Sequence, residues 1–468
     1  MTLTTPGYTL ASTMLAEPQP TWLGDWGRFA AEFRWSDADE DLKAQTRLVL
    51  LDCLGTIAAG MQEPECRALA TRLARNPGGG IAVGAGVHLH AGDAAFLNGV
   101  AGTMLELDEG NSFARGHPGM HVLPVLLAGM ARTDGAGFLR AFLLGYEAGA
   151  RVGASARLRT TLHPHGTWGT IGAAIAASAV ENADADDMIA AFNVSASLGL
   201  GSSLRAMLEG ATVRNAYAGI AARNGLYARD LVATGFSGEI DGVRSVYSSV
   251  LAEGFDPETM IDSLGSRWEI QRNYFKRHAA CRFTHGALDV VKQLIQEHGP
   301  VDADQVDRIE VKSYVMAAQL DAPEPRNMLG AKFSVPFAIA TTLVNGAATV
   351  QAFRAPALTD PRIIGLAARV TVTENAAYTA MLPVKRPAFV AIQFRDGRRI
   401  EGETMTNRGD AADPYSPAEI VDKFMDLAAP VWSRDHARAL HRAVDMLDTE
   451  PEGLVRLHDL LAAPPKEM

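Results

Sequence analysis

The chain has 468 residues, of which 47% are apolar and 21% are charged, and its net charge is −11. This length is about three times a typical domain of ~150 residues, so more than one structural unit is expected. No uninterrupted apolar run reaches the ~18 residues of a membrane-spanning helix. The acidic balance also disfavours a general nucleic-acid binder. We therefore expect neither a membrane nor a nucleic acid among its partners.

Neither the N-terminal segment nor the cysteines match a targeting signal or a disulfide pattern. Residues 1–20 contain three prolines and no Lys or Arg, so they predict a flexible tail that is neither a secretory signal nor a transit peptide. The three cysteines, Cys53, Cys66 and Cys281, form no Cys-x-x-Cys pair. This pattern is typical of a reducing compartment and excludes a disulfide framework and a zinc ribbon. We expect a cytoplasmic protein.

Residues 21–264 are rich in Ala, Leu and Gly and have the spacing of packed helices. Ser36 and Asp37 are predicted to cap a long first helix that runs to about residue 60. Further helices are predicted at 88–107, 118–131, 137–155, 167–181, 187–203, 215–233 and 242–252.

Strand character begins after about residue 270. Strands are predicted at 307–314, 368–375, 389–394 and 398–404, and the last two flank Asp396-Gly397, a strong hairpin signal. Helices are predicted with them at 283–298 and 332–345, then at 417–428 and 432–447. The predicted fold is mainly α with a smaller α+β domain. Residues 21–268 and 409–468 form an all-helical domain, and residues 269–408 form an α+β lid.

Several well-known motifs are absent from the sequence. It has no Gly-Lys pair, and therefore no P-loop, and it has no G-x-S-x-G elbow and no H-E-x-x-H. Three isolated cysteines also make an iron–sulfur hydratase a poor candidate.

The segment LELDEGNSFARGHPGMH (105–121) carries the densest set of chemical groups. Pro118 suits the first turn of a helix, which places His117 at a helix N-terminus, where backbone N–H groups favour anions. The segment is interpreted as an acid/base and carboxylate-binding wall. Two alternatives stay open: a polar capped loop, and a metal site whose ligands would be Glu106, Asp108, His117 and His121.

Two other segments add candidate groups. In LHPHGTWG (162–169), His163 and His165 flank Pro164 before a helix of small residues, an arrangement suited to anion binding or proton transfer. Arg214 lies among Ala, Gly and Thr, so we predict that it faces a cleft.

A basic cluster begins the second domain. KRHAACRFTHGALD (276–289) contains Lys276, Cys281 and Arg282, and such a cluster in an acidic protein indicates a site for a polyanionic substrate. A solvated boundary loop is the alternative. Lys332 is predicted at the head of an apolar helix, where capping the core and binding a ligand are both open.

Taken in order, these segments resemble the MmgE/PrpD family, which includes 2-methylcitrate dehydratase, cis-aconitate decarboxylase and iminodisuccinate epimerase. The resemblance covers nearly the whole chain, through 51–60, 94–110, 116–124, 163–174, 276–289, 331–346 and 398–417. It implies a large all-helical domain, an α+β lid, a cleft between them and a homodimer.

The chain departs from the decarboxylase-like pattern at three positions. Gly110 stands where those members have Thr, Arg214 where they have Lys, and Cys281 where they have His. Decarboxylation of cis-aconitate is therefore disfavoured, and the motif at 109–121 is closer to the epimerase-like branch.

The resemblance and the residues together lead to one hypothesis. The protein is a cofactor-independent lyase or isomerase that abstracts a proton next to a carboxylate of a small di- or tricarboxylate. His163 and His117 are the acid/base candidates, and Asp108 orients one of them. Substrate binding is assigned to Glu106, Arg115, Arg214, Lys276, Cys281, Arg282 and Lys332. The alternatives are a metal-assisted lyase or hydrolase at residues 106–121, and a catalytically inactive binding protein of the same fold.

Overall fold

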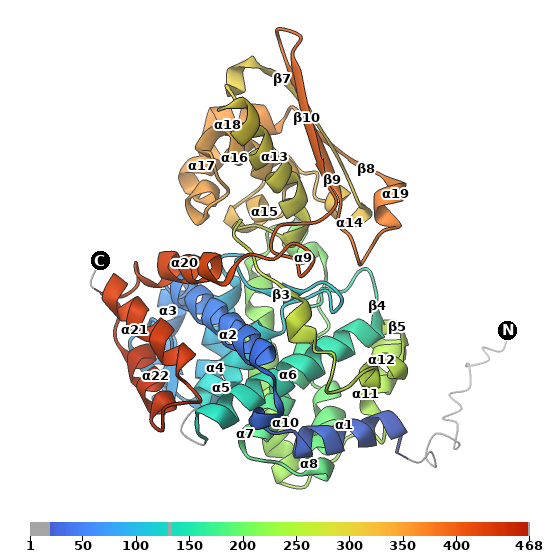
Figure 1. The fold of residues 1–468 in the computed structure, drawn as a ribbon, viewed down its shortest axis with the longest axis vertical. Coiled ribbons are helices and arrows are strands. Elements are labelled where there is room, and N and C mark those ends of the chain that lie inside the picture. Colours follow the sequence, from blue (N-terminus) through green and yellow to red (C-terminus); the bar gives the residue numbers. More distant parts are fainter. Residues whose placement is uncertain (1–18, 130–132, 467–468) are drawn as a thin grey trace, which may run out of the picture.

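A computed structural model describes residues 19–129 and 133–466. Most of the predicted tail and the predicted helical residues 130 and 131 lie outside these ranges. Figure 1 shows two parts, a helical part at the bottom and a sheet with its own helices at the top. The prediction of a mainly helical protein with a smaller α+β part is confirmed.

Helices dominate the first part of the chain. They are α1 (Thr21–Glu32), α2 (Glu40–Gly60), α3 (Pro64–Leu73), α4 (Ala91–Thr103), α5 (Gly119–Ala128), α6 (Gly135–Ser155), α7 (Gly169–Val180), α8 (Ala185–Ala196), α9 (Arg205–Leu208), α10 (Tyr217–Ala233), α11 (Gly242–Ser245) and α12 (Pro257–Ile261). Short strands join them: β1 (Gly80–Ala82), β2 (Val87–Leu89), β3 (Gly110–Asn111), β4 (Ala156–Leu158), β5 (Ala252–Phe255) and β6 (Asn273–Tyr274).

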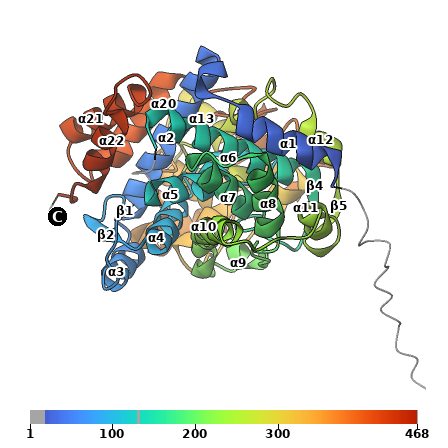
Figure 2. The same ribbon diagram turned by 90° about the horizontal axis from the view of Figure 1, so that it is seen from below.

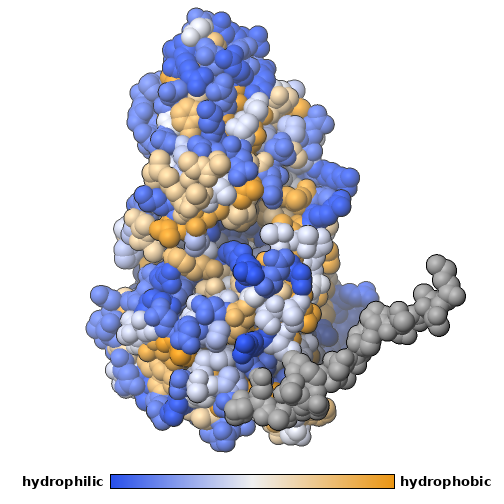
Figure 3. Space-filling view, turned by 90° about the vertical axis from the view of Figure 1, so that its right-hand side faces the viewer, coloured by the Kyte–Doolittle hydropathy of each residue, from blue (hydrophilic) through white to orange (hydrophobic). Residues whose placement is uncertain are grey.

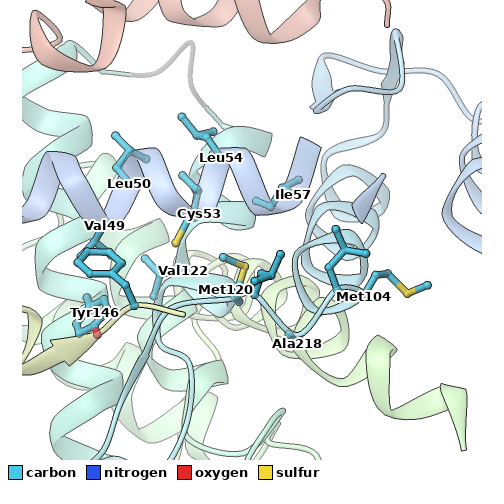
Figure 4. Close-up of a cluster of buried hydrophobic side chains, with 14 of the residues drawn as sticks. Val49, Leu50, Cys53, Leu54, Ile57, Met104, Met120, Val122, Tyr146 and Ala218 are labelled. Carbon is cyan, nitrogen blue, oxygen red and sulfur yellow. The ribbon is translucent and has the colours of Figure 1, made fainter. Parts of the chain in front are cut away.

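Helix α2 runs through the interior of the helical part and is buried on most of its surface. Cys53 points from α2 into a cluster with Met120, Val122 and Tyr146 (Figure 4). The predicted cap is wrong, because Ser36 and Asp37 lie in a 3₁₀ turn and the Asp39 carboxylate instead accepts a hydrogen bond from the N–H of Leu42. Asp39 is the last residue before the helix, so its side chain reaches a free N–H of the first turn.

Three predicted helices are longer than the observed ones. The first residues of the predicted helix 88–107 form β2, since His88 pairs with Ile81. The predicted helix 187–203 ends at Ala196, before the glycines at 199 and 201. The predicted helix 242–252 is one short turn followed by a π-helical turn at 246–250, after which β5 pairs with β4. Strand pairing overrides local helix propensity in the first and third cases, and glycines end the helix in the second.

The second part contains a four-stranded sheet of β7 (Val306–Ser313), β8 (Val370–Glu374), β9 (Ala388–Phe394) and β10 (Arg399–Thr404). The strand order is β10-β9-β7-β8, with β7 and β8 parallel and the other pairs antiparallel. The predicted hairpin at Asp396-Gly397 is confirmed, and Gly397 supplies its positive φ of 91°.

Helices accompany this sheet and close the chain. Those of the second part are α13 (His285–His298), α14 (Val315–Ala318), α15 (Met328–Lys332), α16 (Val335–Asn345), α17 (Ala355–Thr359), α18 (Pro361–Ala367) and α19 (Ala376–Thr379). The last three are α20 (Pro417–Ala428), α21 (Arg434–Asp445) and α22 (Gly453–Ala462). Helix α13 packs against β9 and β10.

The C-terminal helices return to the first part, as the sequence predicts. Helix α20 packs on α2, where the Phe424 ring contacts Gly55 and the Lys423 ammonium lies 2.6 Å from Asp52. Figures 1 and 2 both show α21 and α22 beside the α2 side of the helical part. The exact limits 21–268, 269–408 and 409–468 stay a prediction.

The surface is mixed rather than uniformly polar. In the face shown in Figure 3, hydrophilic residues cover the top of the sheet part, and apolar residues gather nearer the junction of the two parts. Within residues 19–129 and 133–466, no helix combines the length and hydropathy needed to cross a membrane.

Candidate functional site

A cavity of about 290 Å³ is lined by residues of both parts of the structure. The helical part contributes Glu106, Asn111, Arg115, His117, His163, His165 and Arg214. The segments that follow contribute Tyr274, Cys281, Arg282, Phe283, Phe333 and Arg386. Apolar residues such as Leu158, Leu162, Met207 and Met316 complete the wall, as is usual for a small-molecule site.

A short antiparallel ladder brings two of the predicted motifs together. Strand β3 pairs with β6, with Gly110 opposite Tyr274 and Asn111 opposite Asn273. Space at Gly110 is tight, because a Cβ there would lie 2.4 Å from the Tyr274 hydroxyl oxygen. The ladder places the 105–121 motif against the residues that precede the basic cluster, although the two segments are far apart in the sequence.

Asp108, His117 and Lys276 form a buried charged group beside the cavity. The Asp108 carboxylate lies 2.9 Å from His117 Nδ1 and 3.1 Å from Lys276 Nζ. Burial alone raises the pKa of Asp108, but His117, Lys276 and Arg214 together hold it well below its usual range. Asp108 is therefore a fixed negative charge behind the His117 ring.

The hydrogen bonds of His117 define which of its nitrogens is free. Nδ1 faces two acceptors, Asp108 Oδ2 at 2.9 Å and the Glu109 carbonyl at 2.5 Å, so it carries a proton. Nε2 is then the nitrogen that can accept a proton, and the ring lines the cavity.

His163 has the opposite arrangement. The backbone N–H of His165 donates to its Nδ1 at 3.1 Å, and Arg214 Nε donates to its Nε2, so both ring nitrogens face N–H groups. Burial, with Arg214 next in effect, lowers the pKa of His163 well below its usual value. The ring therefore stays uncharged at neutral pH, with Nε2 3.4 Å from Arg214 Nε.

Glu106 and Arg214 lie on the same wall. Glu106 forms ion pairs with Arg214 and, at 3.5 Å, with Lys276. Its backbone has a φ of 55°, a left-handed conformation that is costly for a residue with a Cβ and often marks a functional site. Arg214 Nη2 has no hydrogen bond to a described residue, so a ligand oxygen can still use it.

Of the other predicted binding residues, Cys281, Arg282 and Arg115 line the cavity, whereas Lys276 does not. Arg282 and Cys281 line the cavity, but the Arg282 guanidinium also holds Asp410 at 2.6 Å and so ties the basic cluster to the segment before α20. Arg115 is exposed at the cavity wall and donates to the Ala156 carbonyl. Lys276 is completely buried behind the wall.

The prediction that Lys332 lies at the head of a helix is wrong. Lys332 is the last residue of α15, and α16 begins after Ser334, whose hydroxyl caps the N–H of Phe337. The Lys332 ammonium donates to the Met104 carbonyl at 2.9 Å and is fully buried. Burial lowers the pKa of Lys332 to about 8. It supports the chain just before Glu106 and does not line the cavity.

The structure changes the set of groups that could bind a metal. His121 uses both ring nitrogens, Nδ1 toward the His117 carbonyl and Nε2 as acceptor from Gly166, so it is not available as a ligand. Asp108, His117 and His165 instead offer ligand atoms within 4.8 Å of one another. Lys276 and Arg214 lie beside this trio, and their positive charges oppose a cation there.

The helix N-terminus next to His117 is already occupied by a carboxyl group of the protein itself, that of Glu109. The N–H of Gly119, the first residue of α5, donates to Glu109 Oε1 at 2.8 Å, and Tyr146 donates to Oε2 at 2.9 Å. The prediction that this helix end binds a substrate carboxylate is therefore wrong. Burial raises the pKa of Glu109 to about 8, although both hydrogen bonds oppose the shift.

Glu109 makes stability depend on pH in a defined direction. Its pKa rises from 4.5 to about 8 on folding, so the folded state binds the proton more tightly. The free energy of unfolding must therefore fall as pH rises from about 4.5 to about 8. Glu109→Gln removes this proton and keeps the shape, so the variant is expected to gain stability relative to the wild type across that range.

Urea unfolding midpoints measured from pH 5 to pH 8.5 check this expectation. Glu297→Gln, on the exposed end of α13, is the control and should leave the pH dependence unchanged. Parallel curves for the wild type and Glu109→Gln would show that Glu109 does not bind a proton on folding.

Three polar cavity residues, His165, Tyr274 and Arg386, were given no role in the sequence-based hypothesis. The His165 ring, which the sequence places with His163 in a candidate site, lies 4.6 Å from the His117 ring and 4.9 Å from the His163 ring, between centroids. Tyr274 and Arg386 also line the cavity. Arg386 lies in a Lys-Arg-Pro turn before a strand, which has no chemical signature in the sequence.

The fold and the cavity define a two-part helical and α+β protein with a buried polar site at the junction. Family models match over most of the chain: the MmgE/PrpD N-terminal domain at residues 25–247 and the MmgE/PrpD C-terminal domain at residues 278–449. The chain belongs to the MmgE/PrpD family.

Curated relatives align along nearly the whole length. A cis-aconitate decarboxylase-like protein of Aspergillus oryzae is 24% identical over 461 residues, covering 91% of this chain and 94% of the relative. The cis-aconitate decarboxylase of Aspergillus terreus is 23% identical over 452 residues, covering 90% and 92%. The cis-aconitate decarboxylase of Mus musculus is 25% identical over 387 residues, covering 76% and 75%.

Proposed function

We propose that the protein is a lyase or isomerase that abstracts a proton next to a carboxylate of a small di- or tricarboxylate. The observation that carries the proposal is a pair of imidazoles that line the same cavity in different surroundings. His117 contacts the Asp108 carboxylate, whereas His163 is neutral and contacts N–H groups. Two relatives are named cis-aconitate decarboxylase and a third is named decarboxylase-like, and these names support a lyase-type reaction.

His117 is the base in this proposal. Its Nδ1–H is held by Asp108 and by the Glu109 carbonyl, so Nε2 points its lone pair away from them. When Nε2 takes the substrate proton, the ring becomes an imidazolium whose charge is stabilised by the fixed carboxylate of Asp108.

His163 is the partner that stabilises charge on the substrate. In this proposal the neutral ring carries its proton on Nε2, because Nδ1 accepts the shorter hydrogen bond, from His165. With substrate bound, Nε2 then donates to the oxygen on which negative charge develops, in place of its contact with Arg214. Arg214, 3.4 Å away, can bind the same carboxylate through Nη2. Together they lower the energy of the carbanion-like state that follows proton loss.

Loss of water, or return of the proton to the opposite face, can follow this step. Loss of CO₂ instead forms a carbanion directly, which then takes up a proton. The departures Gly110, Arg214 and Cys281 lie on or beside the cavity wall, and they support water loss or epimerisation over decarboxylation of cis-aconitate. The function proposed is the proton abstraction that precedes water loss or epimerisation.

The experiment is deuterium exchange in D₂O. Citrate, 2-methylcitrate, cis-aconitate and iminodisuccinate are incubated with the protein and analysed by mass spectrometry for deuterium or for product. Incorporation next to a carboxylate, or formation of product, is expected for at least one of them. If neither occurs with any of the four, the inactive binding protein becomes the better account.

The same experiment decides the metal alternative, which the Asp108, His117 and His165 trio supports. Lys276, 3.1 Å from Asp108, already supplies a positive charge at this carboxylate. Exchange is therefore expected to persist after treatment with a chelator, and metal analysis of the purified protein is expected to show no stoichiometric metal. Loss of exchange on chelation, restored by one divalent metal, would favour the metal-assisted mechanism.

A further inference from the structure

Arg386 is a buried cation that extends from the sheet part into the cavity. It lies just before β9, lines the cavity and is only 4% exposed. Its Nη2 donates to the Ser112 carbonyl at 3.3 Å, so it spans from the sheet part to the loop that precedes His117. Its guanidinium carbon lies 5.8 Å from the centre of the Phe283 ring.

Arg386 has no carboxylate partner among the described residues, and its buried Nε has no hydrogen-bond partner there either. The other buried cations at the site differ in this respect. Arg214 pairs with Glu106, Lys276 with Asp108, and Arg282 with Asp410. An unpaired buried guanidinium is costly, so its presence in a cavity points to an anionic ligand.

Arg386 and Arg214 contact different residues around the cavity. Arg386 contacts the Ser112 carbonyl and the Phe283 ring, whereas Arg214 contacts His163. The two guanidinium groups share none of these contacts, so each can bind a carboxylate of its own.

We propose that Arg386 binds a second carboxylate of the substrate, remote from the reacting carbon, and thereby selects di- and tricarboxylates over monocarboxylates. The inference rests on the proposed function for its reacting end, but the anion site itself stands on the burial and the missing partner of Arg386. A guanidinium binds a carboxylate through two parallel N–H groups, which a Lys in its place cannot reproduce.

A series of unreactive ligands tests the proposal by binding. Propane-1,2,3-tricarboxylate, propane-1,2-dicarboxylate and butanoate differ only in the number of carboxylates, and their affinities are measured by calorimetry or, for weak binding, by ligand-observed NMR. Arg386→Gln is expected to weaken binding of the tricarboxylate by ~10–100-fold and to leave butanoate nearly unchanged. Arg386→Lys is expected to lie between the wild type and Arg386→Gln.

Arg398→Gln is the matched control, because Arg398 belongs to the same hairpin but is exposed and stacks on Phe394. It is expected to bind all three ligands as the wild type does. Circular dichroism shows whether each variant folds, and if Arg386→Gln does not fold, the Arg386→Lys affinities decide.

Two results would overturn the proposal: equal losses for the tricarboxylate and butanoate, or an unchanged tricarboxylate affinity in Arg386→Gln. Absence of tricarboxylate binding to the wild type would overturn it as well. Deuterium exchange separates this failure from failure of the proposed function. If deuterium exchange occurs but Arg386→Gln does not selectively lose tricarboxylate affinity, only the role of Arg386 is rejected. If Arg386→Gln selectively loses tricarboxylate affinity but no exchange occurs, only the proton abstraction is rejected.

Discussion

Turnover is expected to fall by ~100-fold or more when His117 is replaced by Gln, because the variant has no nitrogen that can accept the substrate proton. Asp108→Asn is expected to produce a similar loss with the cavity intact, since the amide cannot stabilise the imidazolium that the 2.9 Å contact now supports. The rate of deuterium exchange into the active substrate measures both effects.

His163 gives a second, distinguishable effect. His163→Gln keeps a side-chain N–H donor, so its loss is expected to be smaller than that of His163→Ala, for which ~100-fold or more is expected. His441→Gln, on α21 and outside the cavity, is the control. A wild-type exchange rate in His117→Gln would remove His117 from the role of base.

Lys423→Met is expected to destabilise the fold by ~3–5 kcal/mol, the usual cost of leaving one member of a buried ion pair alone. The Lys423 ammonium lies 2.6 Å from Asp52 and 2.7 Å from the Leu107 carbonyl, and Asp52 is 1% exposed. The pair joins α20 to α2 and supports the chain next to Asp108. Chemical unfolding at pH 8 measures the loss.

Two further variants test the cause of this loss. Burial raises the pKa of Asp52 even with Lys423 opposing it, so the destabilisation of Lys423→Met should shrink at pH 5, where the lone carboxyl takes up a proton more easily. The double variant Asp52→Asn with Lys423→Met should recover part of the stability. Lys43→Met removes a surface pair with Glu40 and should cost less than ~1 kcal/mol. Equal losses in Lys43→Met and Lys423→Met would contradict this account.

Much of the architecture could be predicted because it depends on local pattern. The helix periods in residues 21–264, the four strands and the Asp396-Gly397 hairpin are all present in the structure. The predictions fail where a tertiary contact competes with local propensity. Residues 252–255 form a strand because they pair with β4, and α15 ends at Lys332 because Ser334 caps the next helix.

The site shows the same division between local and tertiary information. By itself the sequence determined the fold class, the family resemblance and which segments carry the acid, base and cationic groups, because residue types and short spacings are local properties. Only the tertiary structure decided how those groups combine. Glu109 and not a substrate holds the α5 N-terminus, and His121 is committed to backbone contacts. Arg386 has no carboxylate partner among the described residues, and its Nε has no hydrogen bond there. Protonation and pairing depend on burial and on neighbours distant in the chain, and these are properties of the folded state alone.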